Sequence, residues 1–155
     1  MYSVSYTSES HRIFTDTRMG VTMTRYRTHN RRKFDLRVHL IFVTKYRRRI
    51  LTGEIASMLK KIIYEFCDQN GWDVIACETD CDHSHLLISY DTTDSVAGIV
   101  KTLKQQTTYK LWIIFKGQLS CYYWKKKVLW SDGYFACSLG DASAKTVQRY
   151  IENQG

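Results

Sequence analysis

His83, Ser84 and His85 form an H-x-H motif, and these residue types suggest chemistry more directly than any other short stretch of the chain. Successive side chains of a strand point to opposite faces, so two histidines two positions apart point the same way. Their two imidazole nitrogens can then bind one metal ion. The motif predicts a metal site, although the same pattern also arises as a pair of surface histidines at a turn.

Two nearby cysteines allow a second interpretation of the same histidines. Cys77 and Cys81 precede the H-x-H motif, and thiolates combined with imidazoles suit tetrahedral zinc. The spacing spans a strand, a turn and a strand rather than a compact knuckle, and buried thiols account for the cysteines without a metal. The zinc site is therefore the weaker alternative.

Positive charge is concentrated in one stretch, from Thr24 to Arg49. This stretch has ten basic residues and one acid, Asp35, whereas the whole chain has a net charge of +8. Concentrated charge of this kind favours a polyanionic partner, because each neutralised phosphate releases a counterion. A solvated face is the alternative. Aromatic residues interleave with the basic ones, which favours single-stranded nucleic acid, where bases stack on rings. The candidate DNA-binding residues are Arg25, Arg27, Arg31, Arg32, Lys33, Lys45, Arg47, Arg48 and Arg49.

Hydrophobic periodicity predicts the elements that must position these residues. Runs rich in β-branched and aromatic residues indicate strands, and apolar residues at three-and-four spacing indicate helices. In chain order the sequence predicts strand 37–44, helix 54–70, strand 72–79, strand 85–90, a helix from Thr93 or Asp94 to about Phe115, strand 129–138 and helix 142–154. Gly71 is placed to end the first helix in a left-handed conformation, and Asp141 or Ser143 is placed to cap the last one.

This order of elements is that of the ferredoxin-like split βαβ fold with one additional C-terminal helix. It predicts an α+β protein with an antiparallel sheet and helices packed on one face. Residues 1–23 are rich in Ser and Thr and lack apolar periodicity, so we interpret them as a loose N-terminal extension preceding a single domain, 24–155.

Composition narrows the class of protein further. The 155 residues are 44% hydrophobic and 25% charged, which suits a folded globule and excludes wholesale disorder. No apolar run reaches the roughly 18 to 20 residues of a membrane helix, and the N-terminus does not follow the pattern of a secretion signal. Five cysteines make a disulfide framework unexpected. We therefore expect a cytoplasmic protein without a membrane partner.

Three strings in the chain carry a family resemblance. HLIFVTKYRRRIL (His39 to Leu51), DHSHLLIS (Asp82 to Ser89) and GYFACSLGDASAKTVQRYIENQ (Gly133 to Gln154) follow one another in order. In order and spacing they resemble the TnpA family, the small single-tyrosine HUH transposases of IS200-like insertion sequences that move as single-stranded DNA. The resemblance covers residue 23 to the C-terminus.

The resemblance implies a set of site residues. In that family the two histidines, together with a glutamine four residues after a nucleophilic tyrosine, hold a divalent metal, Mg²⁺ or Mn²⁺. The matching positions are His83 and His85, Gln154, and Tyr150 as the nucleophile. Residues four apart share one helix face, so Tyr150 and Gln154 can both reach a site built against the sheet. Without the resemblance, Tyr150 is interpreted as a half-buried packing residue.

The resemblance also implies an activity and partners. The activity is cleavage and rejoining of single-stranded DNA through a 5′-phosphotyrosine, and the DNA has hairpins at the element ends. A homodimer is implied, with active sites that can be assembled in trans and with strand 37–44 as a candidate edge for pairing between subunits. The alternatives are a non-catalytic nucleic-acid-binding module and a REP-associated tyrosine transposase.

Overall fold

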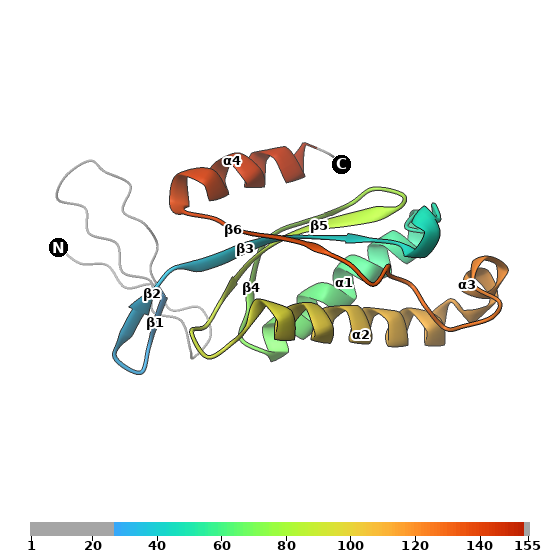
Figure 1. Cartoon of the computed structure of the whole chain (residues 1–155), viewed down its shortest axis with the longest axis horizontal. Coiled ribbons are helices and arrows are strands. Elements are labelled where there is room, and N and C mark those ends of the chain that lie inside the picture. Colours follow the sequence, from blue (N-terminus) through green and yellow to red (C-terminus); the bar gives the residue numbers. More distant parts are fainter. Residues whose placement is uncertain (1–26, 154–155) are drawn as a thin grey trace.

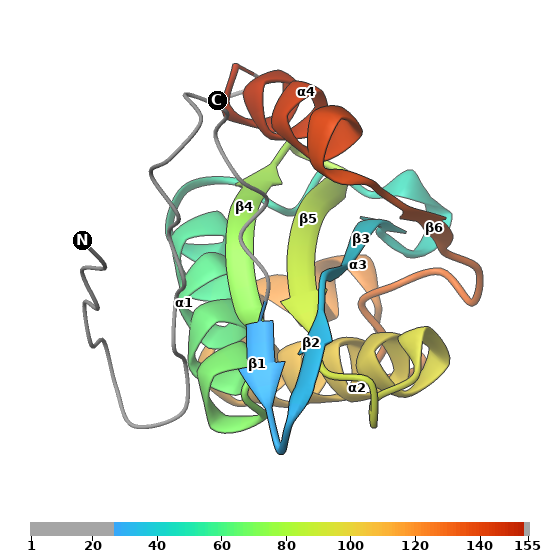
Figure 2. The same cartoon turned by 90° about the vertical axis from the view of Figure 1, so that its left-hand side faces the viewer.

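The computed structural model describes residues 27–153 and consists of three layers (Figure 1). A four-stranded sheet lies between one helix on one face and a pair of long helices on the other, and Figure 2 shows the same layers from the side. Residues 1–26 and 154–155 are outside the described part of the chain. The predicted extension 1–23, Arg25 and Gln154 therefore lie outside the described residues.

The sheet has the ferredoxin-like strand order and is antiparallel throughout. It contains β3 (Leu36–Val43), β4 (Asp73–Thr79), β5 (His83–Tyr90) and β6 (Phe135–Ser138), in the spatial order β4-β5-β3-β6. The predicted α+β class and split βαβ topology are confirmed.

β3 occupies an interior position in this sheet. It pairs with β5 along its whole length and with β6 from Val38 to Ile41. The expectation that strand 37–44 offers a free edge is therefore wrong, since both sides of β3 are hydrogen-bonded within the chain. The last strand is also shorter than the predicted 129–138, because the chain touches the sheet at a single bridge, Thr44 to Trp130, and then joins it only at Phe135.

The helices α1 (Gly53–Gln69), α2 (Val96–Ile114) and α3 (Lys116–Tyr122) pack with one face of the sheet. Gly71 ends the α1 turn at a φ of +70°, as predicted. The helix caps differ from the prediction: the Ser95 hydroxyl accepts the Gly98 N–H at the start of α2, and α4 follows Gly140 without a side-chain cap. The main core lies between these helices and the sheet and includes Leu40, Phe42, Leu59, Ile63, Leu86, Ile88, Leu103 and Leu111.

The last helix, α4 (Asp141–Glu152), lies alone on the other face of the sheet (Figures 1 and 2). It is held by a small apolar cluster in which Ile151 and Ala144 pack with Leu87 of β5 and Ala76 of β4. Ile151 has no exposed surface. Because this cluster is small, α4 is joined to the fold by far less apolar contact than α1 or α2.

A short hairpin that the sequence did not predict precedes the main sheet. β1 (Arg27–His29) and β2 (Arg32–Phe34) pair across a turn in which Asn30 and Arg31 adopt positive φ. The Arg27 guanidinium donates to the carbonyl oxygens of Gly71 at 2.6 Å and Ser89 at 3.2 Å. These bonds fix the hairpin to the end of the sheet at which β5 finishes.

No helix of the described residues is both long enough and apolar enough to cross a membrane.

We expect Ile151→Ala to release α4 locally while the rest of the fold stays intact. Replacing a buried isoleucine with alanine lowers stability by about 2 to 5 kcal/mol. In α4 that loss weakens the one small apolar cluster that holds the helix to the sheet. Hydrogen exchange should show α4 amides losing protection by at least about tenfold, with β3 and β5 unchanged. Ile113→Ala, at a side chain 63% exposed on α2, is the matched control and should leave exchange unaltered. Unchanged protection in α4 of Ile151→Ala would show that other contacts hold the helix.

Candidate active site

Strand β5 places His83 and His85 on the face of the sheet that α4 covers. Their ring centroids lie 4.9 Å apart, so the two side chains point the same way, as the H-x-H spacing predicted. Ser84 between them is fully buried, and its hydroxyl donates to the Glu78 carbonyl oxygen at 3.3 Å. The hydrogen bond lets a small polar side chain occupy the core position between the two histidines.

A third histidine, His39 of β3, lies against this pair. Its Nε2 atom is 3.2 Å from Nδ1 of His85, and the two rings stack at 5.5 Å with 15° between their planes. His39 was not among the site residues predicted from the sequence. The available signal was its place in β3, where it alternates with Val38 and Leu40 of the core and must therefore face α4.

Asp82, which immediately precedes β5, forms a hydrogen bond with His83. Its Oδ1 atom is 2.7 Å from Nδ1 of His83, and its Oδ2 atom accepts from Nε of Arg47 at 3.1 Å. The hydrogen bond with His83, together with the Arg47 charge, lowers the pKa of the Asp82 carboxyl below its usual value. Asp82 is therefore a carboxylate at neutral pH and can only accept the hydrogen bond from His83.

Burial keeps two of the three imidazoles uncharged at neutral pH. Desolvation, together with the nearby His83 and His39, lowers the pKa of His85 to about 4. Desolvation also lowers the pKa of His39. A neutral imidazole retains a lone pair on one ring nitrogen, and that lone pair is what a metal ion requires.

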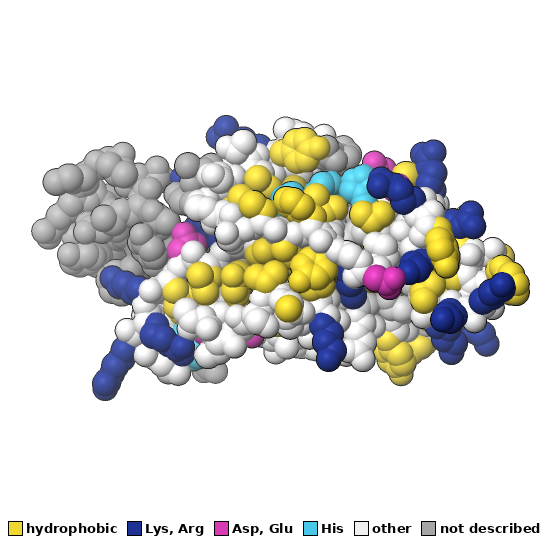
Figure 3. All heavy atoms as spheres, in the orientation of Figure 1, with side chains coloured by type: hydrophobic (Ala, Val, Ile, Leu, Met, Phe, Trp, Pro, Cys, Tyr) yellow, Lys and Arg dark blue, Asp and Glu magenta, His cyan; other side chains and the backbone are white. Residues whose placement is uncertain are grey.

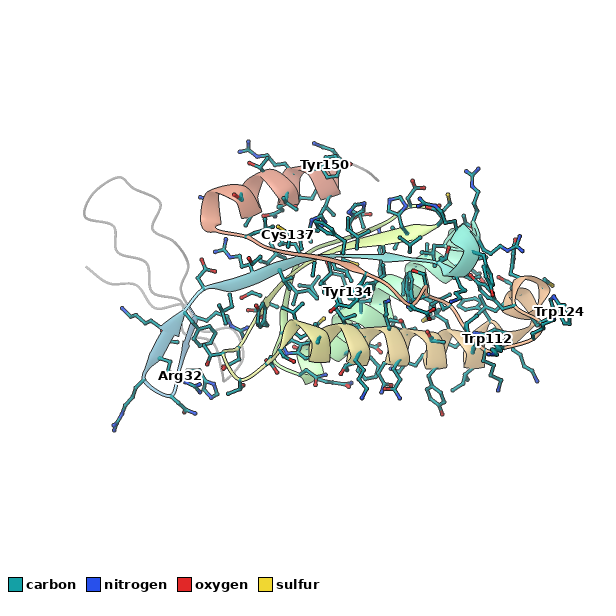
Figure 4. The ribbon with its side chains drawn as sticks, viewed as in Figure 1. Arg32, Trp112, Trp124, Tyr134, Cys137 and Tyr150 are labelled. Atoms are coloured by element: carbon teal, nitrogen blue, oxygen red, sulfur yellow. The ribbon has the colours of Figure 1, made fainter. Side chains whose placement is uncertain are left out.

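Tyr150 reaches the same place from α4. Its ring centroid lies 6.1 Å from that of His85, with the rings nearly perpendicular at 82°. The neighbouring Ile151 is buried beneath the helix, whereas Tyr150 is 54% exposed. Figure 4 shows Tyr150 on the side of α4 near the C-terminus, with Cys137 of β6 below the helix. The structure thus brings Tyr150, His83 and His85 of one chain together.

The donor atoms at this site suit a divalent metal. Both Nδ1 atoms have partners, and within residues 27–153 no hydrogen bond occupies Nε2 of His83 or His85. In the same range, no group of three or more His, Cys, Asp or Glu side chains is arranged to hold a metal. Two imidazoles are therefore the donors that the described chain offers, and further donors must come from outside it, as a glutamine at position 154 would.

The alternative zinc site is wrong. Cys77 is buried in the main core, on the sheet face opposite His83 and His85. Burial raises the pKa of the Cys77 thiol to about 12, so a thiolate is disfavoured there. The four side chains do not converge on one point.

The predicted DNA-binding residues fall into two separate groups. The hairpin group consists of Arg27, Arg31, Arg32 and Lys33, and the turn group, around the 3₁₀ turn η1 (Lys45–Arg47), consists of Lys45, Arg47, Arg48 and Arg49. The eight residues of β3 separate the groups, which corresponds to about 25 Å of strand. The basic stretch is therefore not one continuous surface.

Only the turn group adjoins the histidines. Arg47 reaches Asp82, and Nε of Arg49 donates to the Cys81 sulfur at 3.2 Å. Lys45 pairs with Asp132 at 2.8 Å. Figure 3 shows histidine side chains at the surface below α4 with Lys and Arg side chains beside them. Positive charge thus borders the site on one side, while Arg32 lies at the far end of the molecule (Figure 4).

A groove of about 720 Å³ runs along α2, in the helix layer opposite α4. Tyr109, Trp112 and Trp130 line it together with Lys101 and Lys127. No histidine or cysteine is among the described residues that line this groove. The groove therefore lies apart from the histidines, which are on the sheet face that α4 covers.

Comparison with known proteins identifies the family that the chain resembles. The family described as "Transposase IS200 like" matches residues 32–154. The ISDra2 transposase TnpA of Deinococcus radiodurans is 34% identical over 121 residues, which cover 78% of this chain and 85% of that protein. The transposase for insertion sequence element IS200 of Salmonella typhimurium is 28% identical over 122 residues, covering 79% and 78%.

Two solved structures share the fold. A protein from Deinococcus radiodurans R1 described as a transposase is 30% identical and superimposes with a TM-score of 0.68, covering 83% of this chain and 97% of that one. A REP-associated tyrosine transposase bound to a REP hairpin has 17% identity and a TM-score of 0.55, covering 83% and 70%. The second likeness concerns the fold alone. The family match spans the four strands of the main sheet, the H-x-H motif and the last helix, and the chain belongs to the family of IS200-like transposases.

Proposed function

We propose that this chain is a metal-dependent DNA transposase that cleaves and rejoins single-stranded DNA at insertion-sequence ends, with Tyr150 as its nucleophile. The observation that supports this most directly is the placement of Tyr150 of α4 beside His85 and His83 of β5. A tyrosine, two imidazoles with available Nε2 atoms and a bordering row of arginines are the groups that phosphodiester transfer to a protein side chain needs.

The chain's own residues would divide the reaction between them. A Mg²⁺ or Mn²⁺ ion held by His83, His85 and Gln154 would supply positive charge to the oxygens of the scissile phosphate. The Tyr150 oxygen attacks the phosphorus, the bond to the 3′ oxygen breaks, and the proton lost by the phenol is balanced by one gained at the departing 3′ oxygen. The products are a 5′-phosphotyrosine and a free 3′-OH.

The covalent product accounts for rejoining without an external energy source. The phosphotyrosine retains the energy of the broken phosphodiester, so a 3′-OH can attack it and release Tyr150. Partial exposure of Tyr150 is consistent with this role, because a DNA end has to approach the phenol from solvent.

We expect Tyr150→Phe to bind DNA normally and to form no covalent adduct. Only the hydroxyl is removed, while the ring keeps its contact with His85. The measurement is gel detection of protein joined to labelled single-stranded element ends in the presence of Mg²⁺ or Mn²⁺. Chelation should abolish the adduct in the wild type, and added metal should restore it.

Tyr109→Phe is the control for that experiment, since Tyr109 is also exposed but lies on α2. It should form the adduct at the wild-type rate. An adduct with Tyr150→Phe at that rate would exclude the mechanism. A wild type that binds DNA yet never forms an adduct would favour a non-catalytic binding module.

We further propose that the substrate strand, with hairpins at the element ends, contacts both basic groups. The turn group borders the histidines, and the hairpin group lies about 25 Å of strand away. Phosphate contacts at both places would hold a DNA strand between the two ends of β3 and fix its register at the site.

Neutralising either basic group should flatten the salt dependence of binding. Each lost phosphate contact reduces the slope of log K against log salt by about 0.7 for single strands, so a triple substitution removes up to about 2 units. The two triple variants replace Arg31, Arg32 and Lys33, or Arg47, Arg48 and Arg49, with glutamine. Lys61→Gln, exposed on α1, should leave the slope unchanged. A group whose triple variant keeps the wild-type slope does not contact DNA.

We also propose a homodimer that pairs through β6. In the described chain the outer side of β6 meets no other strand, and its four residues are all exposed. Figure 3 shows hydrophobic side chains gathered across the face of the molecule that carries β6. An unpaired strand edge with adjoining apolar surface favours pairing with a second copy.

Mixed dimers should tell whether Tyr150 acts on its own chain's histidines. The contact of Tyr150 with His85 of the same chain predicts that a mixture of Tyr150→Phe and His83→Ala subunits stays inactive, because every site keeps one defect. Exchange of α4 between subunits would instead create one intact site per mixed dimer and restore part of the cleavage. Light scattering on the same samples checks that dimers form, and a strictly monomeric protein would exclude the homodimer.

A further inference from the structure

The Nδ1 atoms of both H-x-H histidines are engaged by side chains that belong to neither the motif nor the nucleophile. Asp82 holds Nδ1 of His83 at 2.7 Å, and Nε2 of His39 lies 3.2 Å from Nδ1 of His85. A neutral imidazole carries its proton on one nitrogen only, so the partner at Nδ1 decides whether Nε2 keeps a lone pair.

The Asp82 contact determines the proton position on His83 by itself. A carboxylate has no proton to donate, so Nδ1 of His83 must be the donor, and in the neutral ring the lone pair is then on Nε2. Asp82 is in turn fixed from two directions. Arg47 donates to its second carboxylate oxygen at 3.1 Å, and its backbone carbonyl accepts the Thr44 N–H at 2.9 Å.

The His39 contact arises from the register of two strands. Along β3 and β5, His39 is opposite Leu87 and Ile41 is opposite His85, so the two histidines are diagonal neighbours on one face. The His39 ring is also packed edge-on by Phe135 of β6 at 5.9 Å, and only 9% of the residue is exposed. Its position is thus set by all three strands.

His39 is not placed to be a metal ligand itself. Its Nε2 atom points at Nδ1 of His85, and the described residues contain no cluster of three metal-binding side chains. A hydrogen bond between two imidazoles requires one donor and one acceptor, and only a donating Nδ1 on His85 leaves its Nε2 free for a cation.

We propose that His39 and Asp82 are positioning residues. Each accepts a hydrogen bond from the Nδ1–H group of one H-x-H histidine, so that both histidines present Nε2 to the divalent cation. The inference rests on the proposed function in one respect only, that a cation binds these two histidines. His39 accepts through Nε2 and therefore carries its own proton on Nδ1. The proton positions on the three rings are properties of the metal-free protein.

The first test reads those positions directly. The chain has five histidines, so ¹⁵N-histidine labelling gives a spectrum simple enough to assign. In the metal-free wild type at neutral pH we expect His83, His85 and His39 all to carry the proton on Nδ1. A wild-type His85 protonated on Nε2 would overturn the proposal, whether or not the protein cleaves DNA.

Variants at His39 separate positioning from simple packing. The amide oxygen of His39→Gln stands near the place of the imidazole Nε2 and can accept the His85 proton, whereas His39→Leu fills similar space without an acceptor. We expect His39→Gln to keep the His85 proton on Nδ1 and His39→Leu to shift it toward Nε2. Unfolding curves for both variants report whether the fold is intact.

Metal affinity is the second readout. Mn²⁺ binding followed by electron paramagnetic resonance, with and without single-stranded DNA, should weaken by roughly 10 to 100-fold in His39→Leu and Asp82→Ala. His39→Gln and Asp82→Asn, which keep an acceptor oxygen, should stay close to the wild type. Equal Mn²⁺ affinity in His39→Leu and His39→Gln, with both folded, would overturn the role of His39.

The two proposals fail in different ways. A wild type that binds no Mn²⁺ and forms no adduct contradicts the proposed function, but the ¹⁵N spectrum still decides where the protons lie. A wild type that is active while His85 carries its proton on Nε2 contradicts only the present inference.

Discussion

The alternation of β5 side chains between the two faces of the sheet is the constraint on which the site depends. Ser84, Leu86 and Ile88 enter the main core, so His83 and His85 must face the opposite side of the sheet. A slip of one residue in the pairing with β3 would turn both imidazoles into the main core and turn its leucines to the face that α4 covers. Strands on both sides of β5 make that slip costly, because each would have to re-pair. The position of the histidines is therefore secured by the core packing on the other face.

The same face of β5 also positions the tyrosine. Leu87, two residues after His85, is the apolar contact to which Ile151 of α4 docks. Neighbouring residues on a helix are about 100° apart, so anchoring Ile151 beneath α4 turns Tyr150 to the side, where it meets His85 and remains partly exposed. One strand face thus carries both the imidazoles and the apolar anchor of the helix that bears Tyr150. The small area of that anchor leaves α4 the least firmly held of the long elements.

Local patterns in the sequence were sufficient to predict much of this arrangement. The period of α1 and the β-rich runs around β3, β4 and β5 predicted the ferredoxin-like order, and the H-x-H spacing predicted that the two imidazoles share a face. The placement of Tyr150 on the last helix followed from its spacing and from the family resemblance. These features depend on interactions within one element, or on the order of elements, and both can be read along the chain.

Features that depend on pairing between distant segments were missed. His39 meets His85, 46 positions away in the chain, only because β3 and β5 pair in one register. The interior position of β3 depends on β6, whose four residues join the sheet almost a hundred positions later. The β1–β2 hairpin has no alternating apolar pattern and is held by Arg27 bonds to distant carbonyls. Charge density alone likewise could not show that the basic stretch divides into two groups.

The central claim is that Tyr150 forms the covalent bond to DNA, and peptide mapping of the adduct tests it most directly. Trypsin cuts after Arg149, so Tyr150 is the first residue of the released peptide that contains YIENQG. After reaction with single-stranded DNA and Mn²⁺, nuclease trimming and trypsin digestion, tandem mass spectrometry should find the nucleotide phosphate on Tyr150 of this peptide. A phosphate-linked nucleotide on any of the other ten tyrosines, with YIENQG unmodified, would contradict the account.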